Sequence, residues 1–457
     1  MDAALRALLD AIEGFDPASF PLTPSRSAAR LREDLAQRFD PDAPRPLDAL
    51  IVDVCALLRD GITHSTHPRH FGLFNPTTAL PSVIADALVA RFNPQLSVWQ
   101  AAPAAVEMEQ HALGALASRM GLSSAWAKTF TTGGAEANHT ALVLALQRAV
   151  PEYATEGLAG SAIRPTVYVS SEAHGSLTKA AQVTGLGRNA VRHVAVDHAC
   201  RMNVKALRQS IADDRAAGRT PALIVATVGT TSAGAIDPIE RIAQVAREEG
   251  AWLHVDAAWG GIAALSPSTR ALLDGVAEAD SITWDAHKAL PVAMGAGMLF
   301  CRHPEALRAA FEVEAPYMMR GDDDRAQPYL TTMQWSRRFI GLKVLLTLAS
   351  MGWRGVAARV EHQFALAERL RKGLVSRGFE VVNDTALPVV CFTHPRIRTG
   401  RTTTKKVLQA IWRDEVAWVS ETRLGGRIPC LRACITNVDS GEADVDALLE
   451  GVAERVG

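Results

Sequence analysis

An aspartate and a lysine that follow two apolar runs are the residues best placed for chemistry. Asp256 ends the run WLHVD, and Lys288 lies in DAHK directly after SITW. The segment between them is long enough for one helix between two strands. Because successive parallel strands end at the same edge of a sheet, we expect both charges at one ligand-binding edge. A structural ion pair is the simpler alternative, because a carboxylate buried alone is unfavourable.

Three other segments are typical of a site for a flat, phosphorylated ligand. Gly134 and Ala135 open an expected helix after a strand, where free backbone N–H groups attract an anion. His174 follows another strand, where its ring can stack on a ligand, and Thr231 lies in a strand-end turn. Taken alone, each segment is more typical of an ordinary turn or a structural histidine. Their arrival at one edge, together with the two charges, argues against a plain ion pair.

The elements that would position these residues alternate between short apolar runs and amphipathic stretches from about residue 127. This alternation predicts an α/β fold with a mostly parallel central sheet and helices on both faces. The predicted strands are 128–131, 166–170, 191–196, 222–228, 252–256, 281–284 and 298–301. The apolar run LIVATV is typical of a strand buried on both sides.

The sequence divides into three predicted parts. Residues 1–80 are expected to be helical, with proline breaks, and residues 81–345 hold the large sheet. Residues 346–457 form a smaller α+β domain. Its predicted strands are FEVV, LPVVCF and LRACIT, and its helices lie near 404–415 and at the end of the chain.

Composition argues against several classes of partner. The 457 residues carry a net charge of −1, so nucleic acid is not expected. No apolar run reaches the roughly 18 residues that a membrane helix needs. Six cysteines without a CxxC pair predict reduced, mostly buried thiols and a cytoplasmic protein. No metal site is expected at Cys430 and Cys434, which lack a second ligand pair, or at His64, His67 and His70, which a proline interrupts.

The combination of HVDAAWGG and DAHK resembles the group II decarboxylases that depend on pyridoxal 5'-phosphate (PLP). These include glutamate, cysteine-sulfinate, diaminobutyrate and aromatic-amino-acid decarboxylases. The resemblance extends from HPRHFGLFNP through VWQAAPAAVEMEQ and SRRFIGLK to LRACITN. It implies the aspartate-aminotransferase-like fold (fold type I), with a PLP-binding domain at 81–345. It also implies a homodimer in which the N-terminal helical segment packs on the partner.

The resemblance assigns roles to the residues at the expected sheet edge. It implies that Lys288 holds PLP as a Schiff base and that Asp256 keeps the pyridine nitrogen protonated. His174 is expected to stack on the ring. The other implied PLP contacts are Gly134, Ala135, Thr231, Ala258, Asp285 and His287. Asp285 stands where the aromatic-type enzymes usually have asparagine, which leaves its contribution open.

A loop tyrosine supplies a proton to the α-carbon in the resembled family. Tyr329 is nearest to the expected place, although its spacing differs, and Tyr317 is a second candidate. The implied substrate contacts are Phe74, Asn75, Thr77, Ser97, Trp99 and Arg432, of which Ser97 and Trp99 are expected to reach across the dimer interface.

The predicted reaction converts an L-amino acid to its amine and CO2. Phe74 and Trp99 are flat and apolar, which favours an aromatic or bulky substrate. An acidic substrate needs a cation, and the candidate, Arg432, has a counterpart in both kinds of enzyme. The alternatives are a decarboxylation-dependent aldehyde synthase, a PLP carbon–carbon lyase on the same fold, and a scaffold without activity.

Overall fold

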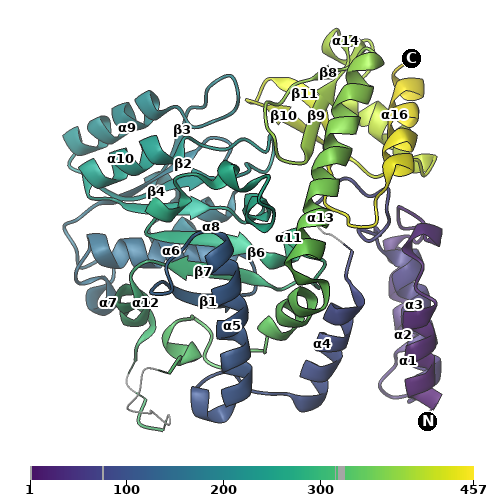
Figure 1. The fold of residues 1–457 in the computed structure, drawn as a ribbon, viewed down its shortest axis with the longest axis horizontal. Helices are drawn as coiled ribbons and strands as arrows, with labels where there is room; N and C mark the ends of the chain where they lie inside the picture. Colours follow the sequence, from purple (N-terminus) through teal and green to yellow (C-terminus); the bar gives the residue numbers. More distant parts are fainter. Residues whose placement is uncertain (1–2, 75–76, 314, 318–324) are drawn as a thin grey trace.

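A seven-stranded sheet forms the centre of the molecule (Figure 1). The structure, a computed structural model, describes residues 3–74, 77–313, 315–317 and 325–457. The strand order is β1-β7-β6-β5-β4-β2-β3. The strands are β1 (Ala127–Thr131), β2 (Pro165–Ser170), β3 (Val191–Val194), β4 (Thr220–Thr227), β5 (Trp252–Asp256), β6 (Ser281–Asp285) and β7 (Gly297–Cys301). Strand β7 is antiparallel to both neighbours, and the pairs from β6 to β3 are parallel. The predicted mostly parallel sheet is therefore confirmed.

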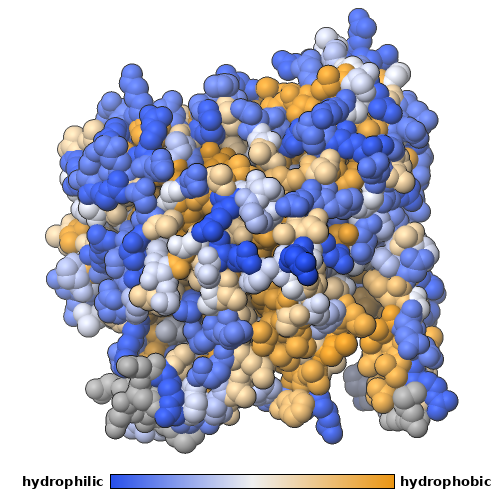
Figure 2. All heavy atoms as spheres, in the orientation of Figure 1, coloured by the Kyte–Doolittle hydropathy of each residue, from blue (hydrophilic) through white to orange (hydrophobic). Residues whose placement is uncertain are grey.

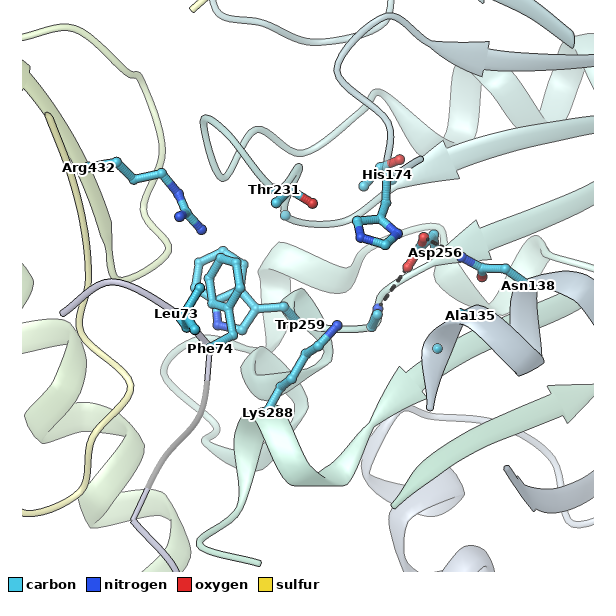
Figure 3. Close-up of a pocket in the computed structure, with 14 residues that line it drawn as sticks. Leu73, Phe74, Ala135, Asn138, His174, Thr231, Asp256, Trp259, Lys288 and Arg432 are labelled. Carbon is cyan, nitrogen blue, oxygen red and sulfur yellow. Dashed lines mark hydrogen bonds between the residues drawn. The ribbon is translucent and has the colours of Figure 1, made fainter. Parts of the chain in front are cut away.

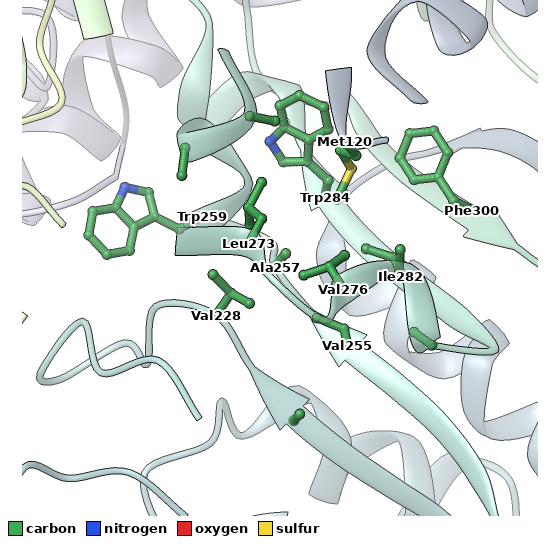
Figure 4. Packing of buried hydrophobic residues seen from close by; sticks show 14 of the residues in the cluster. Met120, Val228, Val255, Ala257, Trp259, Leu273, Val276, Ile282, Trp284 and Phe300 are labelled. Carbon is green, nitrogen blue, oxygen red and sulfur yellow. The ribbon is translucent and has the colours of Figure 1, made fainter. Parts of the chain in front are cut away.

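Helices cover both faces of this sheet, so alternate side chains of one strand enter different cores. Leu223 and Val225 of β4 pack with helices α6 (Gly134–Ala149), α8 (Ser176–Val183) and α12 (Pro304–Phe311). Ile224 and Ala226 enter the opposite core, shown in part in Figure 4. That core is completed by helices α5 (Pro103–Arg119), α9 (Val204–Ala216) and α10 (Ile239–Glu249). Burial on both faces explains the apolar run predicted for this strand.

A second sheet, of four antiparallel strands, forms the C-terminal part. Its order is β10-β11-β9-β8. The strands are β8 (Glu380–Val381), β9 (Val389–Thr393), β10 (Ser420–Leu424) and β11 (Ile428–Cys434). The second half of α13 (Gly341–Ser376) packs on this sheet with α15 (Thr404–Arg413) and α16 (Glu442–Val456). Strand β10 was not predicted, because SETRL is polar and only its last residue is buried.

The N-terminal helices stand beside the body of the molecule (Figure 1). They are α1 (Ala3–Glu13), α2 (Ala28–Arg38) and α3 (Leu47–Gly61), and α4 (Leu80–Phe92) follows. Helix α1 buries no residue. The predicted helical character of this part is confirmed. The part boundaries at 80/81 and 345/346 stay predictions, and the second falls within α13.

Two further expectations concern membranes and thiols. Within the described ranges, no helix is both long and apolar enough to cross a membrane. All six cysteines are unpaired, and five of them are buried, as predicted.

Candidate active site

A cavity opens at the carboxyl ends of β4, β5 and β6, where the large sheet faces the C-terminal sheet (Figure 3). Nine of the predicted site residues line it: Phe74, Gly134, Ala135, His174, Thr231, Asp256, Ala258, Lys288 and Arg432. Sequence reasoning missed five others: Leu73, Asn138, Thr227, Gly229 and Trp259. The cavity therefore joins most of the predicted residues, from both parts of the chain.

Lys288 and Asp256 face this cavity from neighbouring parallel strands. Lys288 lies on α11 (Ala286–Ala289), a single turn directly after β6. Its Nζ is 2.9 Å from Oδ2 of Asp285, so the lysine pairs with this aspartate. Asp256 accepts hydrogen bonds from neutral groups instead. The simpler alternative, an ion pair between Asp256 and Lys288, is therefore not what holds Asp256.

Asp256 is held in a fixed orientation at the end of β5. Its side chain is almost fully buried, with 4% of the residue exposed. The backbone N–H of Ala258 donates to Oδ1 at 3.0 Å, and Nδ2 of Asn138 donates to Oδ2 at 2.8 Å. These two bonds leave acceptor capacity on the carboxylate for an N–H group in the cavity. Asn138 lies on the second turn of α6, within the glycine-rich segment, but nothing in its local sequence marks it as a partner of Asp256.

His174 lies between β2 and α8, next to Asp256 in the cavity wall (Figure 3). Its Nδ1 accepts a hydrogen bond from the backbone N–H of Ser176 at 3.2 Å. The same nitrogen is 2.9 Å from the hydroxyl oxygen of Ser176. The ring is therefore fixed at one edge, while its face remains available for stacking.

The start of helix α6 forms a candidate anion site. Gly134 and Ala135 line the cavity there, and no side chain caps the helix. A Cβ atom on Gly134 would lie 2.9 Å from Oδ2 of Asp285 and 3.1 Å from Cβ of Ala258, so a larger residue there would displace a neighbouring side chain. Free amide groups at a helix start suit a phosphate.

Asp285 and His287 lie behind this glycine turn and are not part of the cavity wall. Both are buried, and Nε2 of His287 is 3.8 Å from Oδ2 of Asp285. Burial lowers the pKa of His287 below its ordinary value, and its Nδ1 accepts the backbone N–H of Ala296. The direct phosphate contact expected of His287 remains a prediction.

Two aromatic rings and a guanidinium form the other end of the cavity (Figure 3). The ring centroids of Phe74 and Trp259 are 4.4 Å apart. The Arg432 guanidinium lies 4.8 Å from the Phe74 centroid. Its Nη1 donates to the carbonyl oxygen of Gly72 and to the Ser420 hydroxyl, which are both neutral. This end offers flat apolar surface and one positive charge.

Four further predicted residues, besides Asp285 and His287, lie away from this cavity wall. The Thr77 hydroxyl donates to Oδ1 of Asn437 at 2.7 Å and has a structural role here. Ser97, Trp99 and Tyr329 lie together elsewhere, and the Tyr329 backbone N–H donates to the carbonyl oxygen of Ser97. The Tyr329 ring packs with Val98, Leu330 and Trp335 and does not line the cavity.

The remaining predictions concern the two tyrosines and one asparagine. The Tyr329 hydroxyl is buried and has no hydrogen-bond partner among the described residues. Tyr317 is 77% exposed and approaches Trp335 at a centroid distance of 6.0 Å. Asn75 lies outside the described residues. The choice between the two tyrosines stays open.

A family model described as the pyridoxal-dependent decarboxylase conserved domain matches residues 30–394. The chain belongs to the pyridoxal-dependent decarboxylase family. This pyridoxal-dependent decarboxylase is 32% identical to cysteine sulfinic acid decarboxylase of Mus musculus over 430 residues, covering 89% of this chain and 85% of the relative. It is 30% identical to aromatic-L-amino-acid decarboxylase of Bacillus atrophaeus over 387 residues, covering 82% and 78%.

The fold of this pyridoxal-dependent decarboxylase agrees with solved relatives. The crystal structure of Oryza sativa TDC with PLP and tryptamine matches it with a TM-score of 0.93 at 26% identity. The match covers 99% of this chain and 97% of that one. The predicted PLP-enzyme fold is therefore confirmed. The relatives differ in the substrates that their names state, so they leave the substrate of this enzyme undecided.

The cavity fits the cofactor of the family. It presents a lysine amine, a buried carboxylate and a helix start with free amides, which are the groups that an aldehyde, a pyridine nitrogen and a phosphate require. The chain is accordingly a PLP-dependent amino-acid decarboxylase, a carboxy-lyase.

Proposed function

We propose that this enzyme converts an aromatic or other bulky L-amino acid to its amine and CO2. The observation that carries the proposal is the arrangement of Lys288 and Asp256, which end adjacent parallel strands and face one cavity. In this proposal Lys288 binds PLP, Asp256 faces the pyridine nitrogen and His174 stacks on the ring. The start of α6 holds the phosphate, while Thr231 and Ala258 contact the ring.

Bound PLP supplies an electron-withdrawing ring that stabilises the charge left on the α-carbon when CO2 departs. The residues of this chain provide the surroundings. Asp256, itself held by two hydrogen bonds, would accept the N–H of the ring. The cavity walls orient the carboxylate bond relative to the ring, which decides the bond that breaks.

Lys288 and Asp285 form the second functional pair of the proposal. Whenever the lysine amine is free, Oδ2 of Asp285 lies 2.9 Å away and can hold it as an ammonium ion. Asp285 is 1% exposed, so this carboxylate is screened from water by the protein. Asparagine at this position would offer an amide and no charge, which is the physical difference from the aromatic-type pattern.

The residues at the substrate end of the cavity support the proposal of a substrate with a bulky side chain. Phe74 and Trp259 provide two ring faces against which a flat side chain can pack. Trp99 contributed to the same expectation, but its indole donates to Glu107 outside this cavity. An acidic substrate is the second candidate, because the hydrogen-bond acceptors that the structure gives Arg432 are neutral.

Carboxyl-labelled amino acids test the reaction and its substrate together. Release of CO2 and amine would be measured for tryptophan, tyrosine, phenylalanine, glutamate, aspartate and cysteine sulfinate, with Lys288→Ala as the inactive control. We expect the highest kcat/KM for one of the aromatic substrates. A higher value for any acid would replace the first candidate by the second. Consumption of amino acid without CO2 release would contradict decarboxylation itself.

We also propose a homodimer. Helix α4 carries an exposed apolar stripe at a spacing of four residues: Leu80, Ile84, Leu88 and Phe92. Figure 2 shows apolar side chains over this helix and on the N-terminal helices beside it. A stripe of this kind is typical of a protein interface. In this assembly, Ser97, Trp99 and Tyr329 are candidates to reach the partner's cavity.

Light scattering tests the dimer. The wild-type chain should have twice the mass of the monomer, and Ile84→Glu combined with Phe92→Glu should lower that mass. Val375→Glu is the matched control, because Val375 is an exposed apolar residue on α13, outside the stripe. Equal masses for all three proteins would contradict this interface.

The unpaired cysteines support the further expectation of a cytoplasmic protein.

A further inference from the structure

The amide of Asn138 uses all of its hydrogen-bonding capacity inside the protein. Its Nδ2 donates to Asp256 at 2.8 Å and to the Ser176 hydroxyl oxygen at 3.0 Å. Its Oδ1 accepts from the Thr283 hydroxyl at 2.8 Å and lies 3.0 Å from Nε2 of His254. An amide has two donor hydrogens and two acceptor lone pairs, so no capacity remains. Only 1% of this residue is exposed.

The side of Asn138 that faces the sheet fixes the direction of these bonds. The Trp252 indole N–H donates to the Ser281 hydroxyl oxygen at 2.8 Å, and that oxygen is 2.8 Å from Nδ1 of His254. Burial lowers the pKa of His254 to about 4, so the ring is neutral at pH 7 and carries one proton. Because Oδ1 of Asn138 can only accept, that proton lies on Nε2, and Nδ1 accepts from the Ser281 hydroxyl.

On the cavity side, each of the two N–H groups of Asn138 donates one hydrogen bond, and these two bonds start two branches of the network. One N–H holds Oδ2 of Asp256. The other N–H is donated to the Ser176 hydroxyl oxygen, whose own hydrogen is then directed at Nδ1 of His174. The Ser176 backbone N–H reaches the same nitrogen. Nδ1 of His174 is therefore an acceptor, and the proton of the neutral ring lies on Nε2.

We propose that Asn138 is the positioning residue that fixes the orientation of Asp256 and directs the Ser176 hydroxyl at Nδ1 of His174, which the Ser176 backbone N–H also holds as an acceptor. The inference rests on the proposed function in that Asp256 and His174 are taken as the PLP contacts. The four strand residues of the network, Trp252, His254, Ser281 and Thr283, lie on one face of β5 and β6, and α6 brings Asn138 onto that face. The packing of α6 on the sheet thus extends the hydrogen-bond network of these strand residues to the cavity.

Three substitutions separate the branches. Asn138→Ala removes both branches, and Ser176→Ala removes only the hydroxyl that reaches His174. Thr283→Val is nearly isosteric and removes one of the two donors to Oδ1, while the His254 donor stays. We expect the largest effects for Asn138→Ala, effects limited to His174 for Ser176→Ala, and small effects for Thr283→Val.

The readouts are measured on the full-length protein with PLP bound. The nitrogen-15 chemical shifts of the His174 ring report its tautomer, and the pH dependence of cofactor absorbance reports the ring nitrogen environment. Ser176→Ala should shift the Nδ1 resonance of His174, because one of its two donors is lost, while the backbone N–H of residue 176 keeps the ring proton on Nε2. The absorbance profile should stay unchanged. Asn138→Ala should change both readouts and weaken PLP binding on the order of 10-fold to 100-fold, the range found for residues that orient the ligands of a metal ion.

A merely structural Asn138 would lower the melting temperature and leave both spectroscopic readouts as in wild type, and that result would overturn the proposal. An Asn138→Ala protein that fails to fold leaves the decision to Ser176→Ala, because unchanged His174 shifts in that variant contradict the network. Neither readout depends on turnover. If the wild-type protein binds PLP but releases no CO2 from any amino acid, the proposed function fails while the spectra still decide this inference.

Discussion

The two ends of the cavity are built differently. At the cofactor end, Asp256 and Asn138 have hydrogen-bond partners for all their polar side-chain atoms, and they are held by the end of β5 and by helix α6. At the substrate end, Phe74 and Arg432 come from distant parts of the chain. There, Nε of Arg432 and Nε1 of Trp259 are buried without a hydrogen-bond partner in the described part of the chain.

This difference indicates where each property of the enzyme resides. The fully bonded Asp256–Asn138 pair is preorganised, so it can serve one chemistry for many substrates. The substrate end combines a loop, a turn and the C-terminal sheet, which can change independently. We therefore expect substitutions at the cofactor end to affect all substrates alike and those at the substrate end to discriminate between them.

The largest expected effect follows from removing the carboxylate of Asp256. Asp256→Ala should lower kcat for every accepted substrate by on the order of 10²–10³-fold, because the charge at the α-carbon loses its electrostatic support. PLP should still bind through Lys288, which the absorbance of the purified variant would show. Turnover near the wild-type value would contradict the assignment of Asp256.

The second prediction concerns the protonation of the α-carbon. If Tyr329 supplies this proton, Tyr329→Phe should lower the yield of amine more than the yield of CO2. Oxygen and water would convert the remainder to aldehyde, ammonia and hydrogen peroxide. Amine, aldehyde and peroxide would be measured side by side, with Tyr317→Phe as the control. An unchanged amine yield for Tyr329→Phe would move the assignment to Tyr317.

Arg432 tests the substrate end directly. Arg432→Met should lower kcat/KM for an acidic substrate by about 10²-fold, because a buried acid would lose its cation. For an aromatic substrate the expected loss is smaller, since Phe74 and Trp259 remain. Arg432→Lys keeps the charge and serves as the control. Equal losses for both substrate classes would show that Arg432 contacts a group common to all amino acids.

The smallest expected effect concerns the buried ring of His70 and the pH dependence of the free energy of unfolding. His70 stacks on Trp418 at a centroid distance of 4.8 Å, and both of its ring nitrogens lack partners among the described residues. Burial lowers the pKa of His70 from 6.5 to about 4. The unfolded chain thus binds more protons than the folded protein between these values. The stability that the neutral His70 ring contributes is fully present above pH 6.5 and is lost as the pH falls toward 4.

His70→Phe should therefore reduce the loss of unfolding free energy between pH 7 and pH 5 by about 2 kcal/mol. Denaturant melts at the two pH values would measure it. His193→Asn, at an exposed position of β3, should behave as wild type. An acid sensitivity of His70→Phe equal to that of wild type would contradict the role of this buried ring.

The sequence predicts the sheet well because each strand is a short apolar run with a clear end. Asp256 and Lys288 were found for the same reason, since a charge directly after a buried run needs a function or a partner. Asn138 and His254 were missed because they contact each other across 116 residues of the chain, and Asn138 reaches Asp256 across 118. Their types are ordinary for a helix and a strand.

The substrate end was predicted less completely for a related physical reason. Thr77 and Trp99 lie in segments that the resemblance places near the substrate, but their side chains bond to Asn437 and Glu107 instead. Trp259 follows the recognised aspartate by three residues, and its place in the wall depends on the turn after β5. Side-chain direction in loops is set by tertiary contacts that a local pattern does not contain.

The most direct test of this account is reduction of the PLP-loaded enzyme with borohydride, followed by peptide mapping. Reduction fixes the cofactor to the amine that holds it. We predict one labelled peptide, with the added mass on Lys288 and none in Lys288→Ala. A label of equal yield on another lysine, or one retained in Lys288→Ala, would contradict the central assignment.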